Sequence, residues 1–485
     1  MELTDKDLAS VQQVRKLLYN AHEAKQKMAK LSQQEIDRIV KAISDSAAAN
    51  AEHLAKLAVD ETGFGNVQDK KIKNLFAAQT VYNAVKDMKT VGIIGKDEKN
   101  KILEFASPVG VIAAIIPSTN PTSTVIYKSI IAVKSGNPIV FSPHPKALNC
   151  ILETVKIIYK AAYDAGLPDA AISCISIPTI QATTELMKHN YTNLILATGG
   201  PGMVKSSYSS GTPAIGVGAG NGPAFIDKTA DIEKAVKRII ESKTFDNGTI
   251  CASEQSIIIE KCIEDRVVSA LKANGAYLMD KNESGKLAKF LFKDGKLNPE
   301  IVGKTAKYIA QMADLDHVPQ DTTVLVARET SVGAKVPYSQ EKLAPVLALY
   351  VEDNVDNILS KCVDILNFEG IGHSFMMHTE DEELVKRFAA VIPASRIVIN
   401  SPGSVGGIGA TTNLFPALTL GCGASGGSSS SNNIGPMDLI NIKRVAYGTK
   451  DLGDIRASTG CTGANCSMNQ ETIEYIVNSV MKKLI

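Results

Sequence analysis

The chain has 485 residues, with 52 lysines and arginines against 51 aspartates and glutamates, so its formal net charge is only +1. This near balance excludes the strongly basic surface that a partner of nucleic acid or of an acidic membrane needs. The first residues, MELTDKDLAS, carry neither the basic start nor the apolar run of a secretory signal. The longest apolar run, VGVIAAIIP, is too short to cross a bilayer.

Length and cysteine content narrow the class of protein further. A chain of this size is expected to form roughly two to four domains around a sizeable core. Its eight cysteines show no framework spacing, which predicts reduced thiols and no metal site. We therefore expect a cytoplasmic globular protein that binds neither nucleic acid nor a membrane.

The first 88 residues show helical patterns. Apolar residues recur at helical spacing from Leu8 to Leu18, and SQQE (Ser32 to Glu35) is a capping box ahead of a second amphipathic run. Residues 89–107 hold two strand-like runs around a charged, turn-forming middle, which predicts a hairpin.

Apolar strands alternate with helices over residues 108–227, and a second α/β stretch covers 228–425. This alternation is typical of parallel, doubly wound sheets, which bind nucleotides at the carboxyl ends of their strands. The predicted fold class is therefore α/β, with two doubly wound parallel-sheet domains and a small β element.

The last part of the chain changes character. Residues 421–433 are rich in Gly and Ser and are expected to lack core residues. The region 426–448 ends in one strand, LINIKRVAYG, which is followed by a polar, flexible linker over 449–468. An amphipathic helix is predicted over 469–485.

Two short stretches carry candidate chemistry. FDNGTICASEQS contains Cys251, which is either a nucleophile or, more commonly for a lone cysteine among apolar residues, part of the packing. IIPSTNPTS places Asn120 just after a buried strand, where its amide could donate to a developing oxyanion. The alternative for Asn120 is a turn-forming residue before Pro121.

Three further stretches are ambiguous when taken alone. In ATGGPGM, Thr198 and the two following glycines form a strand-to-helix turn that either approaches a phosphate or is merely tight. Glu341, in EKLAPVLALY, is either functional or a solvated residue at a strand edge. His373 and His378, in GIGHSFMMHTED, could supply a base or be structural.

In their order along the chain, these motifs resemble those of the aldehyde dehydrogenase superfamily, over about residues 5–448. FSPHPKA, GVGAGNGP and GHSFMMHT are most similar to its CoA-acylating branch, which includes the aldehyde half of bifunctional aldehyde/alcohol dehydrogenases. The resemblance implies that residues 1–88 join a dinucleotide-binding domain at 108–227 and that 228–425 form the catalytic domain. It also implies that the hairpin 89–107 and the region 426–448 pair subunits into a dimer or a dimer of dimers.

The same resemblance implies a role for single residues. Cys251 matches the catalytic thiol, and Asn120 matches the oxyanion donor, which is partnered by the backbone N–H of Cys251. Glu341 matches the residue that holds the nicotinamide ribose. The remaining cofactor-binding positions are Pro117, Ser142, Thr198, Gly199 and Gly200.

Two departures from the hydrolytic members of the family bear on the reaction. Those enzymes activate water with a glutamate, whereas the matching stretch here, GVGAGNGP, has Gly218 at or near that position and no acid. This favours CoA over water as the acyl acceptor, with His373 as the candidate for assisting the CoA thiol. Ser142 takes the place of a lysine beside the adenosine ribose, which leaves the preference between NAD and NADP open. The expected cofactor is NAD, with NADP possible.

The expected reaction is oxidation of a short-chain aldehyde, of the acetaldehyde or propionaldehyde class, to acyl-CoA. The alternatives are a hydrolytic aldehyde dehydrogenase that gives a free acid, or a non-catalytic binding protein of the same fold. The intact set Asn120, Cys251 and Glu341 argues against the non-catalytic alternative.

The terminal helix resembles the encapsulation peptides that carry enzymes into bacterial microcompartments. It predicts a shell protein as partner and the compartment lumen as location; the alternative is that the helix docks on its own protomer or subunit. Two cysteines in the linker, Cys461 and Cys466, lack further ligands and make a poor metal site.

Overall fold

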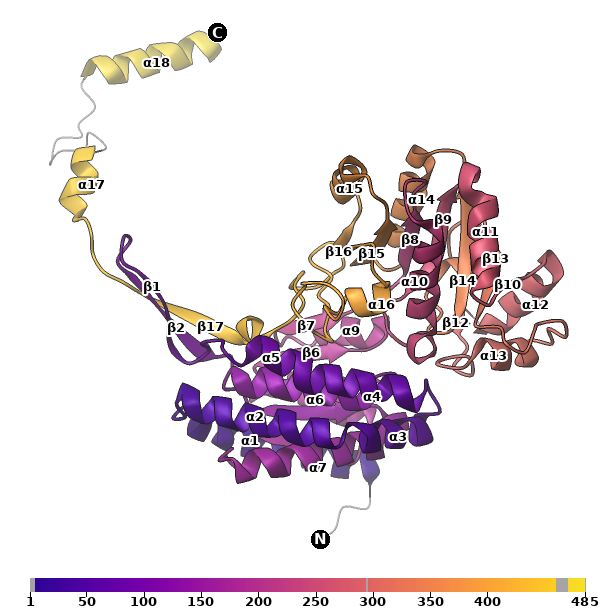
Figure 1. The fold of residues 1–485 in the computed structure, drawn as a ribbon. Helices are drawn as coiled ribbons and strands as arrows, with labels where there is room; N and C mark the ends of the chain where they lie inside the picture. Colours follow the sequence, from indigo (N-terminus) through magenta and orange to yellow (C-terminus); the bar gives the residue numbers. More distant parts are fainter. Residues whose placement is uncertain (1–4, 294, 459–469, 485) are drawn as a thin grey trace. The chain divides into compact units, whose positions relative to one another are not determined.

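The computed structural model describes residues 5–293, 295–458 and 470–484, and the chain divides into two compact units (Figure 1). The first unit runs to Gly92 and resumes over Ser107–Asn441. The second unit comprises Ile93–Ala106 and the chain from Ile442 onward. All of the predicted catalytic and cofactor-binding residues therefore belong to the first unit.

The first unit begins with helices, as the apolar spacing predicts. They are α1 (Lys6–Met28), α2 (Gln33–Ala49), α3 (Ala51–Thr62), α4 (Val67–Leu75) and α5 (Val81–Val85). The capping box is confirmed, because the Ser32 hydroxyl accepts the Glu35 N–H and the Glu35 carboxylate accepts the Ser32 N–H. Between α4 and α5 the backbone widens into a π-helical turn, η1 (Phe76–Thr80). This conformation is rare in proteins, and where it does occur it is often at a functional site.

A five-stranded parallel sheet follows, in the order β5-β4-β3-β6-β7. Its strands are β3 (Ile112–Ile116), β4 (Ile139–Pro143), β5 (Ile172–Cys174), β6 (Leu194–Thr198) and β7 (Ala214–Val217). Its helices are α6 (Pro121–Lys134), α7 (Leu148–Asp164), α8 (Ile180–Lys188) and α9 (Pro201–Tyr208), with a 3-10 turn, η2 (Pro145–Ala147), before α7.

Helices cover both faces of this sheet. Successive side chains along each strand point to opposite faces, and both sets pack against helices. Ile112 and Ala114 lie in the core shared with α2, α6 and α7, whereas Ala113 and Ile115 lie in the core shared with α1 and α8. The chain runs from β3 outward to β5 and then crosses to β6 on the other side of β3. The carboxyl ends of β3 and β6 therefore flank a switch point, where such sheets bind nucleotides.

A seven-stranded parallel sheet forms the rest of the first unit, in the order β10-β13-β14-β9-β8-β15-β16. Its strands are β8 (Gly222–Ile226), β9 (Glu254–Glu260), β10 (Ala276–Leu278), β13 (Val324–Arg328), β14 (Val346–Glu352), β15 (Gly372–His378) and β16 (Ala394–Ile399). A short hairpin, β11 (Phe292–Lys293) with β12 (Lys296–Leu297), lies outside it. Two doubly wound parallel sheets confirm the predicted fold class.

Helices again cover both faces. On one face lie α10 (Ile232–Thr244) and α11 (Glu264–Ala273), and on the other α12 (Lys281–Leu291), α13 (Ala306–Met312), α14 (Val355–Phe368) and α15 (Glu382–Ala389). The remaining short elements are α16 (Gly403–Gly406), η3 (Phe245–Gly248), η4 (Lys261–Ile263), η5 (Pro337–Ser339) and η6 (Pro436–Leu439).

The prediction that residues 421–433 lack core residues is wrong at Cys422. This cysteine is only 2% exposed and belongs to the main core cluster. The glycines around it allow the chain to fold back tightly, since Gly421 donates to the carbonyl of Asn432 and Gly423 to that of Ser430. The turn thereby directs one thiol inward from an otherwise polar stretch.

The second unit contains a three-stranded sheet, in the order β1-β2-β17. The predicted hairpin supplies β1 (Gly92–Asp97) and β2 (Ile102–Pro108), and β17 (Ile440–Ala446) is the strand predicted after the Gly/Ser-rich turn. Part of the predicted linker is instead a short helix, α17 (Leu452–Ser458), which Asp454 caps by accepting the Asp451 N–H at 2.8 Å.

The predicted terminal helix is α18 (Gln470–Leu484). Residues 459–469, which include Cys461 and Cys466, lie outside the described residues. No helix in the described part of the chain is both long enough and apolar enough to cross a membrane.

Candidate active site

Cys251 lies in the turn that leads from η3 into β9, and the backbone of η3, just before this turn, is strained. Asp246 and Asn247 are consecutive non-glycine residues in the left-handed region, with φ of 48° and 53°. Such strain persists only where surrounding contacts hold it, and it is concentrated at functional sites. A Cβ at Gly220 would overlap the carbonyl oxygen of Cys251, so the cysteine turn is pressed against the loop of residues 218–221.

The electrostatic surroundings keep the Cys251 thiol protonated in this state. Burial raises the pKa of Cys251 to about 12, with smaller contributions in the same direction from Glu341 and Cys422, whereas Arg396 lowers it. A thiolate is the reactive form of cysteine. A role for Cys251 as a nucleophile therefore requires that its negative charge be stabilised.

Asn120 lies beside this turn, although the two are far apart in the sequence. It is the residue before Pro121 at the start of α6. Its Nδ2 donates to the carbonyl oxygen of Thr249, two residues before Cys251, at 3.3 Å. Its Oδ1 accepts from Nζ of Lys73 at 2.5 Å. The structure thus brings together the predicted nucleophile and the predicted oxyanion donor.

A buried charged cluster supports both segments, and sequence reasoning missed it. Asp246 Oδ2 pairs with Nζ of Lys73 at 2.5 Å and with Nζ of Lys70 at 2.9 Å. Burial lowers the pKa of Lys73 to about 8, although Asp246 opposes that shift. Asp246 lies in the same stretch as Cys251, FDNGTICASEQS. Both lysines come from α4, whose sequence has the pattern of an ordinary amphipathic helix.

Glu341 faces the same loop from the other side. Its Oε1 accepts the Gly220 N–H at 3.0 Å, and its own N–H donates to Oε2 of Glu369 at 2.7 Å. Burial, reinforced by the charge of Glu369, raises the pKa of Glu341 to about 8. Glu341 is half-buried and hydrogen-bonded to the loop that borders Cys251, which favours a functional residue over a solvated residue at a strand edge.

The predicted cofactor positions occupy one edge of the five-stranded sheet. Pro117 follows β3, Ser142 lies on β4, and Thr198 ends β6, so all three are at the carboxyl ends of adjacent parallel strands. The Ser142 hydroxyl is within 2.9 Å of Oγ1 of Thr183.

This edge fits a dinucleotide. Oγ1 of Thr198 is buried without a hydrogen-bond partner, which leaves it available to a ligand. Gly199 and Gly200 follow at the start of α9, and a Cβ at Gly200 or Gly218 would meet nothing within 4 Å. Open backbone beside a helix N-terminus is what a pyrophosphate requires.

His373 lies deep in the protein, only 1% exposed, at the start of β15. Its Nδ1 is 3.0 Å from Oγ of Ser374, and its Nε2 has no partner. Burial, with a smaller contribution from Arg396, lowers the pKa of His373 to about 3. The imidazole is therefore neutral at physiological pH, which disfavours a role as a strong base in this state.

Arg396 is a second group that sequence reasoning missed. It is buried on β16, and its guanidinium donates to the carbonyl oxygens of His373 at 2.9 Å and Gly421 at 2.7 Å. Burial raises the pKa of both Cys251 and Cys422, and the positive charge of Arg396 opposes that rise. It is thus a buried cation able to favour a thiolate.

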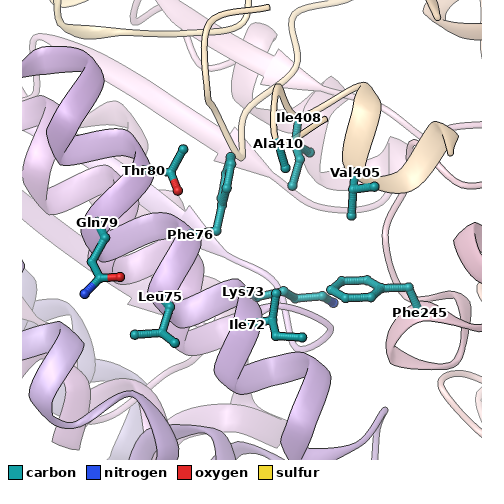
Figure 2. A pocket seen from close by; sticks show the side chains of 10 residues that line it. All are labelled: Ile72, Lys73, Leu75, Phe76, Gln79, Thr80, Phe245, Val405, Ile408 and Ala410. Atoms are coloured by element: carbon teal, nitrogen blue, oxygen red, sulfur yellow. The ribbon is translucent and has the colours of Figure 1, made fainter. Parts of the chain in front are cut away.

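A cavity of about 280 Å³ is lined by Lys73, whose Nζ donates to Asn120 and Thr249, and by Phe245, the first residue of η3. Figure 2 shows the side chains that line the cavity, among them those of Phe245 and Lys73. The other lining residues come from α4, the π-helical turn η1 and the segment around α16: Ile72, Leu75, Phe76, Gln79, Thr80, Val405, Ile408 and Ala410. Most of this surface is apolar.

This fold and this site define a class of protein: the chain belongs to the aldehyde dehydrogenase family. The sequence model of the aldehyde dehydrogenase family matches residues 2–284. Individual relatives narrow the similarity within the family. The chain is 46% identical over 429 residues to an aldehyde-alcohol dehydrogenase of Clostridium acetobutylicum. That match covers 87% of this chain and 49% of the relative, so the chain spans about half of that relative's length.

Solved structures show the same fold. An acetylating aldehyde dehydrogenase from Geobacillus thermoglucosidasius has 51% identity and a TM-score of 0.91, covering 93% of this chain and 99% of its own. A propionaldehyde dehydrogenase from the fucose utilisation microcompartment of Clostridium phytofermentans has 30% identity and a TM-score of 0.81, covering 90% and 97%. Further structural neighbours were solved with bound NADP⁺ or with bound CoA.

Proposed function

We propose that the chain is a CoA-acylating aldehyde dehydrogenase, which oxidises a short-chain aldehyde with NAD(P)⁺ and CoA to an acyl-CoA. The single observation that carries this proposal is that the Asn120 amide is hydrogen-bonded to the turn that holds Cys251, while Lys73 contacts the same amide and lines an apolar cavity. The acetylating and propionaldehyde dehydrogenases among its structural neighbours support it.

The chemistry follows from these groups. The Cys251 thiolate forms a bond from its Sγ to the aldehyde carbon, and the carbonyl oxygen becomes an alkoxide. Nδ2 of Asn120 and the backbone N–H of Cys251 stabilise that charge; loss of one such donor costs about 10²–10³-fold in rate. NAD(P)⁺, when bound along the Thr198 edge, supplies the acceptor for the hydride that leaves the same carbon. The acyl group then remains as a thioester on Cys251.

The acyl acceptor decides the subclass. The loop of residues 218–221, which borders Cys251, contains Gly218, Ala219, Gly220 and Asn221 and no carboxylate. Water needs a base to attack a thioester, whereas a CoA thiolate exchanges one thioester for another and releases the Cys251 thiolate. The composition of this loop therefore supports CoA as the acceptor.

His373 remains our candidate for assisting the CoA thiol. Its unpartnered Nε2 supports this role, because a neutral imidazole nitrogen can accept a hydrogen bond from the thiol. We expect His373→Gln to slow CoA-dependent turnover and to leave the first burst of NADH unchanged. An equal slowing of the burst would assign His373 to an earlier step.

The lining of the cavity supports an uncharged aldehyde as substrate. Lys73 is its one charged lining residue, and Nζ of Lys73 is already occupied by Asp246, Asn120 and Thr249. An aldehyde with a carboxylate or sulfonate would find no available cation there. Each methylene buried against the apolar wall contributes about 0.8 kcal/mol, or roughly fourfold in kcat/KM.

The terminal helix supports the proposal that the enzyme is confined in a bacterial microcompartment. The helix would bind a shell protein there. Ile473, Ile476, Val477, Val480 and Met481 lie on one face of α18, and their side chains are 45–54% exposed. A short helix of this kind needs a partner to bury such a face. The similarity to a microcompartment propionaldehyde dehydrogenase adds to this support.

Product analysis tests the proposal. The purified chain is supplied with C2 to C6 aldehydes and NAD⁺ or NADP⁺, with and without CoA, and NADH or NADPH, acyl-CoA and free acid are measured. We expect acyl-CoA as the main product and no turnover in Cys251→Ala, which should still bind the dinucleotide. Free acid formed at the same rate without CoA would favour a hydrolytic enzyme, and no reduction with any aldehyde would favour a binding protein.

A further inference from the structure

Lys73 joins the nucleophile turn to the oxyanion donor within one buried cluster. Its Nζ donates to Oδ2 of Asp246 at 2.5 Å, to Oδ1 of Asn120 at 2.5 Å and to Oγ1 of Thr249 at 3.1 Å. The side chains of Lys73 and Asp246 are 3% and 0% exposed. All three N–H bonds of the ammonium are thus used inside the protein.

An ammonium group can only donate hydrogen bonds, so the atom of Asn120 that faces Lys73 must be the carbonyl oxygen. The –NH₂ group is thereby turned to the opposite side of the amide. There Nδ2 donates to the carbonyl oxygen of Thr249, in the segment that leads to Cys251, at 3.3 Å and to Oγ1 of Thr119 at 3.2 Å. Without a neighbouring cation, an asparagine amide can rotate so that its oxygen and nitrogen exchange places.

We propose that Lys73 is a positioning residue that locks the Asn120 amide with its –NH₂ group toward the alkoxide formed on Cys251. This inference rests on the proposed function, because it assumes that an oxyanion develops there. A rotated amide would present its carbonyl oxygen to the alkoxide, and repulsion would replace stabilisation. Lys73 would therefore affect the reaction without touching the substrate's reacting atoms.

Lys70 is a matched control within the same cluster. Its Nζ also pairs with Oδ2 of Asp246, at 2.9 Å, and donates to the carbonyl oxygen of Thr119 at 2.9 Å. It is as deeply buried as Lys73 and lies on the same helix, α4, but it has no bond to the Asn120 side chain. Loss of either lysine removes one cation from Asp246, and only loss of Lys73 removes the donor to the Asn120 amide oxygen.

The test compares Lys73→Met with Lys70→Met in the full chain. We expect Lys73→Met to lower kcat for NADH formation by about 10²-fold, as for a lost oxyanion donor, with KM nearly unchanged. Lys70→Met should lower kcat by less than about tenfold, because the donor stays in place. Melting temperature and dinucleotide binding, measured for both variants, show that both have folded.

A double-mutant cycle with Asn120→Ala separates positioning from general damage. If Lys73 acts through the amide, Lys73→Met should lower kcat little further once Asn120 is alanine. Where the methionine variants do not fold, the pair Lys73→Gln and Lys70→Gln gives the same comparison. Lys73→Gln keeps an N–H donor and should therefore retain more activity than Lys73→Met.

Two results would overturn the inference: equal losses in the Lys73 and Lys70 variants, or a full additional loss on the Asn120→Ala background. Both are measured against an active wild-type chain, with CoA saturating and product identity known. Failure of the proposed function would appear differently, as a wild-type chain that reduces no cofactor or that makes free acid.

Discussion

Among single side chains, Glu341 gives the clearest dependence on pH. Its pKa is raised to about 8 by burial and by Glu369, against the opposing charges of Lys243 and Lys342. An unfolded glutamate titrates near 4.3. The native state therefore holds an extra proton between these two values, and stability falls as pH rises through this interval.

We predict that Glu341→Gln removes this loss, because an amide cannot ionise. The melting temperature of the variant should exceed that of the wild type by an amount that grows from pH 5 to about pH 8 and is constant above it. Thermal unfolding without cofactor, over that pH range, measures the difference. Glu382→Gln, at an exposed position, is the control. A difference that shrinks with rising pH would contradict the prediction.

Sequence patterns gave the residues that we propose to act and missed the buried charges that contact them. Cys251, Asn120 and Glu341 stand in short motifs whose order is visible in the chain. Lys73, Asp246 and Arg396 are buried charges, and burial of a charge requires partners from distant segments. The sequence of α4 has the pattern of an ordinary amphipathic helix, and this pattern gives no sign that two of its lysines are buried.

Among the helices and strands, the π-helical turn η1 and the short helix α16 form opposite walls of the cavity. We predict that Val405→Phe, on α16, shortens the cavity and lowers kcat/KM for butyraldehyde more than for acetaldehyde. The discrimination should be about fourfold for each methylene that no longer fits. Steady-state rates with C2 to C6 aldehydes measure it.

Val391→Phe is the control for this prediction, since Val391 is 53% exposed and does not line the cavity. Equal losses for all chain lengths in Val405→Phe would show that the aldehyde does not occupy this cavity.

The terminal helix α18 carries its own prediction. Residues 469–485, fused to a fluorescent protein, should direct it into shells, and deletion of these residues should spare activity in solution. Val477→Asp should abolish targeting because it places a charge on the apolar face, whereas Asn478→Asp, on the opposite face, should not. Fluorescence microscopy of shell-forming cells reads the outcome. Diffuse fluorescence would defeat targeting, and lost activity on deletion would favour docking of the helix on its own enzyme.

For the molecule as a whole, we predict a dimer or a dimer of dimers. Within the described residues, β17 pairs with β2 on one edge and with no other strand on its second edge. Ile442 and Val445 on this strand are 37% and 43% exposed. Open strand edges with apolar side chains are normally covered by a partner.

Light scattering at micromolar concentration checks the assembly. Ile442→Asp should shift the mass toward the monomer, and Val391→Asp, at an exposed position outside β17, should not. A monomeric mass for the wild-type chain would count against pairing through this sheet.

The sequence by itself determined what depends on neighbours in the chain. Period and capping fixed the helices around Ser32, continuous apolar runs fixed the parallel strands, and motif order indicated the family and the position of Cys251. Only the tertiary structure decided which distant segments meet. It set the lysines of α4 against Asp246 and Asn120, turned Cys422 inward and formed the cavity between η1 and α16. The physical reason is that local patterns act over a few residues, whereas a buried ion pair or a cavity depends on how whole elements pack, which no short stretch encodes.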